Sequence, residues 1–137
     1  MLINILLIEN DEFDLESTSR KIKYNSAVGN VIHFTNGNTA IDYFFKSGKY
    51  TNIANHILPH LIMIDLSLTH YTGDAILKTI KENGNEEIQS IPILIVATNA
   101  NHPLKLSCFN LGANGFLNKP IDANYFTDFL IKFGLHK

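Results

Sequence analysis

Short apolar runs alternate with segments of helical spacing along the whole chain, and this alternation constrains the fold more than any other feature. The runs are INILLI (3–8), VIHF (31–34), LIMI (61–64), ILIV (93–96) and the shorter GFL (115–117). Nearly continuous apolar runs of this length are typical of strands that are covered on both faces in a parallel sheet. We therefore expect five strands in one sheet with helices on both sides.

Apolar residues at helical spacing predict helices between the strands and after the last one. The segment at about 12–24 is expected to be a polar helix whose inner face is marked by Leu15 and Ile22. Asn38 and Thr72 are candidate caps of two later helices, and the segment 82–92 is expected to be a loop. The apolar stripes are Ala40, Ile41, Phe44 and Phe45; Ile76, Leu77 and Ile80; and Tyr125, Phe126, Phe129, Leu130 and Phe133.

This alternation predicts an α/β fold with a doubly wound parallel sheet, formed by residues 1–137 as a single domain. In such sheets, sites form at the carboxyl ends of the strands. Polar residues follow four of the five predicted strands at that end. They are Glu9, Asn10 and Asp11, then Asp65, Thr98 and Lys119. The chain therefore brings acids and one lysine to a common edge.

Asp65 stands at the end of LIMID, a stretch that otherwise reads as a fully buried strand. An unpaired charge is unfavourable in apolar surroundings, where a carboxyl group tends to take up a proton instead. We therefore expect Asp65 to lie at a strand end that opens to solvent, or beside a cation. Both placements point to chemistry at this residue.

Composition narrows the possible functions. The formal net charge is -2 and the basic residues are scattered, so nothing indicates a nucleic-acid partner. No segment is apolar over a length that could span a membrane, and the N-terminus lacks the pattern of a signal peptide. A cytoplasmic protein with no membrane or nucleic-acid partner is the expectation.

Four blocks resemble the receiver domain of two-component response regulators: ILLIENDEFD, LIMIDLSLTHYTG, IPILIVAT and LGANGFLNKP. They occur in the family's order, and together they cover nearly the whole chain. Two longer stretches are more similar to the small single-domain regulators typified by the cyanobacterial phytochrome partners. They are FFKSGKYTNIANHILPHLIMIDL and LGANGFLNKPIDANYF. The resemblance implies a flavodoxin-like, five-stranded sheet of order 2-1-3-4-5 without an output domain. It also implies a phosphoryl group taken from a sensor histidine kinase or phosphotransfer protein, with Mg²⁺ in the site.

The resemblance assigns roles to individual residues. Asp65 matches the phosphoacceptor, and a carboxylate is a competent nucleophile for phosphoryl transfer. Lys119 matches the lysine that pairs with the acceptor and with its phosphoryl oxygens, and the bond to Pro120 matches one that is usually cis. Glu9 matches a metal-binding acid of the family, and the backbone carbonyl of Ser67 matches a metal ligand. The chain is then a phosphoacceptor that can catalyse its own phosphoryl transfer and dephosphorylation, without being an enzyme in the usual sense.

The chain departs from the family pattern around this site. Asn10 stands where the family usually has an acidic metal ligand, and Thr69 replaces a common proline. Asp11 follows Asn10, and for this residue a metal role and a helix N-terminal role are both open. Ala97 occupies the switch position that usually carries a hydroxyl, while Thr98 falls one residue away from it. Phe116 takes the place of the switch aromatic.

Two functions fit these observations. The first is a receiver that accepts a phosphoryl group on Asp65 and signals by binding other proteins. The second is a degenerate receiver that binds partners without phosphorylation, which Asn10 and Ala97 favour. In the family, the face corresponding to about residues 103–134 carries dimer or partner contacts. A homodimer through this face is therefore an expectation, with Phe109, Tyr125 and Phe129 as candidate exposed residues.

Overall fold

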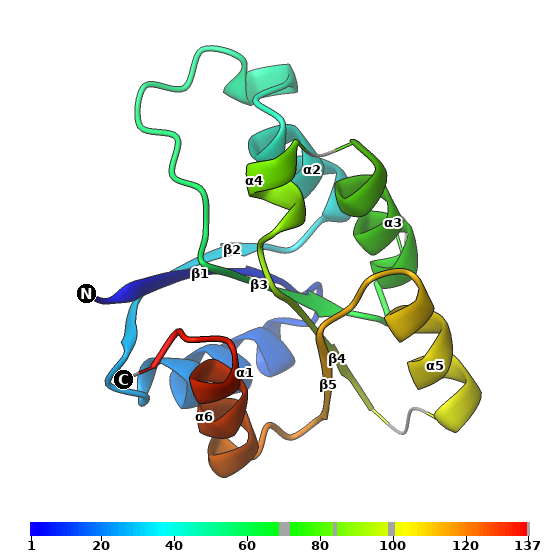
Figure 1. Ribbon diagram of the computed structural model, residues 1–137. Coiled ribbons are helices and arrows are strands. Elements are labelled where there is room, and N and C mark those ends of the chain that lie inside the picture. The colour runs from blue at the N-terminus through cyan, green and yellow to red at the C-terminus, as the bar shows by residue number, and fades with distance from the viewer. Residues whose placement is uncertain (69–71, 84, 99–100, 137) are drawn as a thin grey trace.

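The computed structural model describes residues 1–68, 72–83, 85–98 and 101–136. Strands and helices alternate along the chain in these residues, as the apolar pattern predicts (Figure 1). The elements are β1 (Ile3–Ile8), α1 (Glu12–Lys23), β2 (Val28–Phe34), α2 (Gly37–Phe44), the 3-10 helix η1 (Gly48–Tyr50), β3 (Leu61–Asp65), α3 (Gly73–Asn83), α4 (Glu86–Gln89), β4 (Ile93–Ala97), α5 (His102–Asn110), β5 (Gly115–Asn118) and α6 (Ala123–Lys132). No helix in these residues is long and apolar enough to cross a membrane.

The five strands form one parallel sheet in the order β2-β1-β3-β4-β5, which confirms the expected fold class and strand order. The pairing places Ile8 beside Ile64, and Asp65 beside Val96. The carboxyl ends of the central strands therefore lie at one edge. Polar residues that follow β1 and β3 in sequence become neighbours there.

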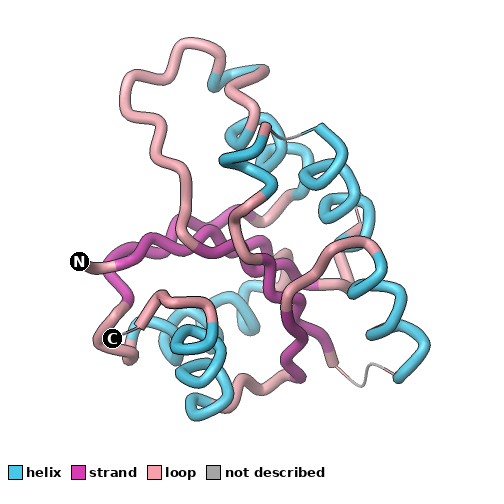
Figure 2. The backbone as a smooth tube through the Cα atoms, in the orientation of Figure 1, coloured by secondary structure: helices cyan, strands magenta, loops and turns pink. Residues whose placement is uncertain are grey.

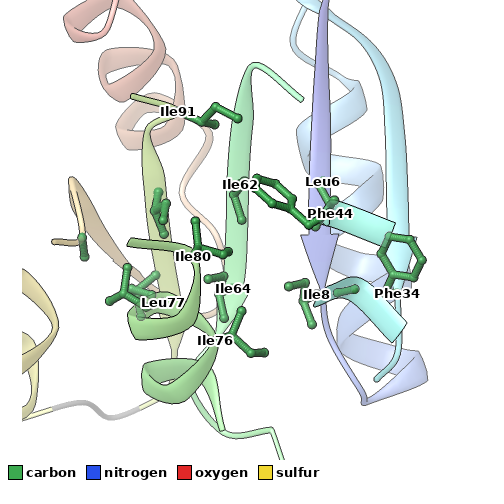
Figure 3. Packing of buried hydrophobic residues seen from close by; sticks show 14 of the residues in the cluster. Leu6, Ile8, Phe34, Phe44, Ile62, Ile64, Ile76, Leu77, Ile80 and Ile91 are labelled. Atoms are coloured by element: carbon green, nitrogen blue, oxygen red, sulfur yellow. The ribbon is translucent and has the colours of Figure 1, made fainter. Parts of the chain in front are cut away.

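Both faces of the sheet are covered by helices (Figure 1). Alternate residues of each strand point to opposite faces, so each strand contributes to two separate cores. Figure 3 shows the core beneath α2 and α3, where Ile62 and Ile64 of β3 meet residues such as Phe44 and Ile76. On the other face, Leu61 and Met63 of the same strand lie in the core covered by α1 and α6. Because both faces of these strands are buried, their sequences do not alternate between apolar and polar residues.

The helix starts follow local capping chemistry, with one difference from the predicted caps. Asn36, not Asn38, caps α2, because Asn36 has extended backbone angles and its side chain accepts hydrogen bonds from the Asn38 and Thr39 amides. Asn38 itself lies inside the helix. The α3 helix begins directly after Thr72, where the start was predicted.

The segment 82–92 is not wholly loop, because it contains the four-residue helix α4. The Asn85 side chain caps this helix by accepting a hydrogen bond from the Ile88 amide at 2.9 Å. Ile88 is buried and anchors the helix to the core. By contrast, the segment between α2 and β3 is mostly irregular apart from η1 (Figure 2).

The last helix buries most of its predicted stripe. Phe126 and Leu130 are buried, but 67% of Tyr125 is exposed. The expectation that Phe129 is exposed is wrong, because its ring lies directly against Gly115 of β5. A Cβ atom at Gly115 would come within 2.5 Å of that ring. A glycine in the strand makes room for this aromatic side chain.

Candidate functional site

Asp65 is the last residue of β3, and of the two placements expected for it the structure shows the one beside a cation. The strand ends at the carboxyl edge of the sheet, yet only 4% of the side chain is exposed. Its Oδ2 atom lies 3.1 Å from the ammonium Nζ of Lys119, and its Oδ1 atom accepts a hydrogen bond from the Ser67 amide at 3.0 Å. A cation and a backbone donor thus compensate for the burial of the carboxylate.

Lys119 directly follows β5, and its side chain reaches Asp65 at the carboxyl edge of the sheet. Its amide donates to the carbonyl oxygen of Ala97, which ties the end of β5 to the end of β4. The bond between Lys119 and Pro120 is cis, as predicted. The ammonium donates to Glu9 Oε1 at 2.5 Å and to Asp14 Oδ2 at 3.0 Å. Lys119 therefore contacts carboxylates from β3, from the end of β1 and from α1.

The two buried carboxyl groups do not share the same charge state. Burial, a hydrogen bond with Asp65 and the nearby charge raise the pKa of Glu9 to about 8. Burial also acts to raise the pKa of Asp65, but hydrogen bonds from Glu9 and from the Ser67 amide, together with the Lys119 charge, hold it below its ordinary value. Of the two groups, Asp65 is therefore the one that loses its proton more readily.

The charge of Lys119 is secured by its partners. Burial acts to lower the pKa of the ammonium, but the hydrogen bonds to Glu9 and Asp14 and the charge of Asp65 raise it above the ordinary value. The lysine is therefore a permanent cation at neutral pH. It can stabilise negative charge that develops beside Asp65.

A glycine allows α3 to start close to the acceptor strand. A Cβ atom at Gly73 would lie 2.6 Å from the Asp65 carbonyl oxygen and 2.7 Å from the Leu66 Cα. Because both neighbours are backbone atoms, a side chain at this position would have to displace the turn that follows Asp65. Gly73 thus fixes the approach of α3 to the site.

Asp11 has the helix N-terminal role in the structure, and its metal role stays a prediction. Its side chain caps α1 by accepting a hydrogen bond from the Asp14 amide at 2.9 Å, so the helix N-terminal role is present. Asn10 directly follows the buried Glu9 and is only partly exposed. Ser67 is exposed two residues beyond the acceptor. Thr69 lies outside the described residues.

Two of the predicted switch residues, Ala97 and Phe116, belong by strand alternation to the face of the sheet opposite the carboxylates. Ala97 is 2% exposed at the end of β4, and Phe116 of β5 packs against the core beneath α2–α5. The ammonium of Lys105 on α5 lies 5.4 Å from the centre of the Phe116 ring. Thr98 is exposed beyond the end of its strand. The structure thus brings the side chains of Glu9, Asp65 and Lys119 together, whereas Ala97 and Phe116 belong to the opposite face of the sheet.

Sequence reasoning missed Asp14, which contacts Lys119 across 105 positions of the chain. The available signal was its place in the first turn of a helix that follows β1, because this turn starts at the same edge of the sheet. That placement alone does not say which way a side chain points.

Comparison with known proteins identifies the family. The family model described as response regulator receiver domain matches residues 5–130. The chain is a response regulator receiver domain. It therefore belongs to the signalling proteins of two-component systems, and the similarity expected from the four sequence blocks is confirmed.

Individual relatives of this receiver domain include phytochrome response regulators. Response regulator Rcp1 of Synechocystis sp. (strain ATCC 27184 / PCC 6803 / Kazusa) is 27% identical over 115 residues, which are 84% of this chain and 75% of that protein. The solved bacteriophytochrome response regulator AtBRR is 27% identical, with a TM-score of 0.83 and coverage of 100% of this chain and 96% of that one. The solved Mn²⁺-bound form of Rcp1 is 25% identical, with a TM-score of 0.74 and coverage of 97% and 91%.

Proposed function

We propose that this receiver accepts a phosphoryl group on Asp65 from a phosphohistidine of a sensor histidine kinase or phosphotransfer protein. The observation that carries the proposal is the Lys119 ammonium 3.1 Å from Asp65 Oδ2. An ionised Asp65 oxygen attacks phosphorus, and the bond from phosphorus to the imidazole nitrogen breaks. The bonding electron pair stays on the imidazole, which then takes a proton from solvent. Asp65 becomes an acyl phosphate, and Lys119 stabilises the charge on the phosphoryl oxygens.

The oxygen-rich edge around Asp65 also fits a divalent metal ion, which we take to be Mg²⁺. Glu9 and Asp65 offer carboxylate oxygens, Asn10 offers an amide oxygen, and Ser67 offers a backbone carbonyl. Mg²⁺ prefers such oxygen ligands and usually keeps several waters. The raised pKa of Glu9 supports this role. It indicates that two buried carboxylates are unfavourable side by side, and a bound cation would compensate for their charge. Bound there, the ion would neutralise charge on the phosphoryl oxygens.

Acetyl phosphate and Mg²⁺ test the acceptor directly. We expect intact mass to show one added phosphoryl group on the wild-type protein and none on Asp65→Asn. Asp11→Asn is the matched control, since asparagine can still cap α1, and it should be modified like the wild type. Addition that persists in Asp65→Asn would refute the assignment of the acceptor. No addition to the wild type would overturn the proposed function and favour a receiver that binds partners without phosphorylation.

The output of the receiver is protein binding, and residues 103–134 supply a surface for a downstream partner or a second copy. Phe109 on α5 is 45% exposed and Tyr125 on α6 is 67% exposed. Each is a candidate contact residue, because exposed apolar surface can mark an interaction site. Sedimentation of the wild type and of Tyr125→Asp should show self-association that only the wild type retains. If both are monomers and both accept phosphate from the kinase alike, this face is not the interface.

A further inference from the structure

Asp14 differs from the other two carboxylates that contact Lys119. Glu9 and Asp65 stand at strand ends, and their side chains are 2% and 4% exposed. Asp14 lies on the first turn of α1 and is 36% exposed, with its Oδ2 atom 3.0 Å from the Lys119 ammonium. It is therefore the member of the cluster that solvent can reach most easily.

The Asp14 side chain is not needed to start the helix. The backbone amide of Asp14 donates to the side chain of Asp11, and this hydrogen bond caps α1. The cap involves no atom of the Asp14 carboxylate, which instead contacts a lysine 105 positions away. A change from aspartate to asparagine can thus remove the charge and leave the local backbone intact.

The ammonium of Lys119 has three protons to donate, and three carboxylates surround it. A phosphoryl group on Asp65 needs at least one of these protons, so an existing contact must weaken when it arrives. Asp14 takes no part in the chemistry proposed for Glu9 and Asp65. The Asp14 carboxylate therefore continues to compete for a proton of Lys119 when a phosphoryl group arrives on Asp65.

We propose that Asp14 is a positioning residue that holds Lys119 toward α1 and so restrains phosphoryl transfer to Asp65. This inference rests on the proposed function. The restraint acts in one direction, because the Asp14 carboxylate competes with the incoming phosphoryl oxygens for the lysine protons. Water hydrates the partly exposed Asp14 once the lysine leaves it, so the restraint is small enough for the reaction to proceed.

The rate of phosphorylation by acetyl phosphate at saturating Mg²⁺, followed by intact mass, tests the proposal. We expect Asp14→Asn to react about threefold to fivefold faster than the wild type, near the upper end of the range for a partly exposed charge pair. Asp14→Glu keeps the charge and should react within about twofold of the wild type. Glu12→Gln removes a charge from the same helical turn and should also leave the rate unchanged.

A double-mutant cycle separates positioning of the lysine from a general effect of charge. In a Lys119→Met background we expect Asp14→Asn to change the rate by less than about twofold, because its effect passes through the lysine. Three outcomes would overturn the proposal: an Asp14→Asn rate equal to or below that of the wild type, the same acceleration without Lys119, or the same acceleration in Glu12→Gln. If Asp65 of the wild type takes no phosphoryl group, the proposed function and this inference fail together. An unchanged Asp14→Asn rate beside a phosphorylated wild type removes the inference alone.

Discussion

The two sides of the sheet at its carboxyl edge are built from opposite chemistry. On the side covered by α1, one ammonium contacts three carboxylates, and those of Glu9 and Asp65 are almost fully buried. On the side covered by α5, Ala97 is buried at the end of β4 and the partly buried ring of Phe116 packs against an apolar core. The side covered by α1 therefore holds the charged groups, whereas Ala97 and Phe116 on the side covered by α5 are apolar.

The two sides are nevertheless adjacent along the strands. Asp65 lies beside Val96 in the sheet, and Ala97 is the next residue of β4, so its side chain points to the opposite face. Lys119 donates its amide to the carbonyl of Ala97, which is a backbone link between them. A ligand shifts a conformational equilibrium only if it interacts differently with the two states. The difference between the sides therefore suggests that phosphorylation and its conformational effect are separable in this receiver.

The first way to test this comparison is to supply the missing hydroxyl. We expect beryllofluoride, which mimics a phosphoryl group, to change amide spectra near Asp65 in the wild type but to leave the region around Phe116 almost unchanged. Ala97→Thr should extend the change to Phe116. A hydrogen bond to a charged group contributes about 1.5–3 kcal/mol, and about 1.4 kcal/mol is a tenfold change in population.

The neighbouring hydroxyl provides the control for this experiment. Thr98 is exposed beyond the end of β4, so Thr98→Ala should respond to beryllofluoride like the wild type. A full response at Phe116 in the wild type would show that the hydroxyl is not needed. A full response that is lost in Thr98→Ala would mean that Thr98 supplies it instead.

The sequence predicted the sheet well because buried parallel strands leave a direct signal in composition. The run LIMID became β3 with all five residues buried, and every strand was found within a few positions. The errors arose where only a few residues decide the structure. The helix α4 has four residues and depends on the side chain of Asn85, and the burial of Phe129 depends on the absence of a side chain at Gly115.

The site was predictable to the extent that strand order determines it. Residues at the ends of β1, β3 and β5 must meet at one edge, so Glu9, Asp65 and Lys119 could be named together. Asp14 could not, because its contact depends on how α1 lies across the sheet. The protonation of Glu9 could not be predicted either, since it follows from burial beside a second carboxyl group.

A smaller effect is expected from restoring an acid at position 10. Asparagine offers a neutral oxygen where an aspartate offers a charge, and charge supplies much of the binding of Mg²⁺. We expect Asn10→Asp to bind Mg²⁺ more tightly than the wild type by about 1–2 kcal/mol, on the order of a hydrogen bond to a charged group. Calorimetric titration with Mg²⁺ measures the affinities of the wild type and of Asn10→Asp. Asp11→Asn keeps the helix cap and should bind Mg²⁺ like the wild type, whereas equal affinities of wild type and Asn10→Asp would mean that another group already supplies the charge.

The last prediction concerns the pH dependence of metal binding on the charged side. Burial and the hydrogen bond with Asp65 raise the pKa of Glu9 from 4.5 to about 8, so below that pH a proton must leave before the carboxylate can bind a cation. We expect Mg²⁺ affinity to rise by up to about tenfold per pH unit as the pH approaches 8 from below, which is about 1.4 kcal/mol per unit, and then to level off.

The same group sets an opposite trend in the metal-free protein. A carboxyl group with a raised pKa binds more protons in the folded state, so its contribution to the free energy of unfolding is complete below 4.5 and is lost as the pH rises through 8.

Titrations with Mg²⁺ at about pH 6.5, 7.5 and 8.5, each in two buffers of different ionisation enthalpy, report both the affinity and the released proton. Glu9→Gln has no proton to release, and its weaker binding should not depend on pH in this range. A wild-type affinity that is equally flat would mean that Glu9 is already ionised beside Asp65, and that the charged side holds its two carboxylates through Lys119 alone.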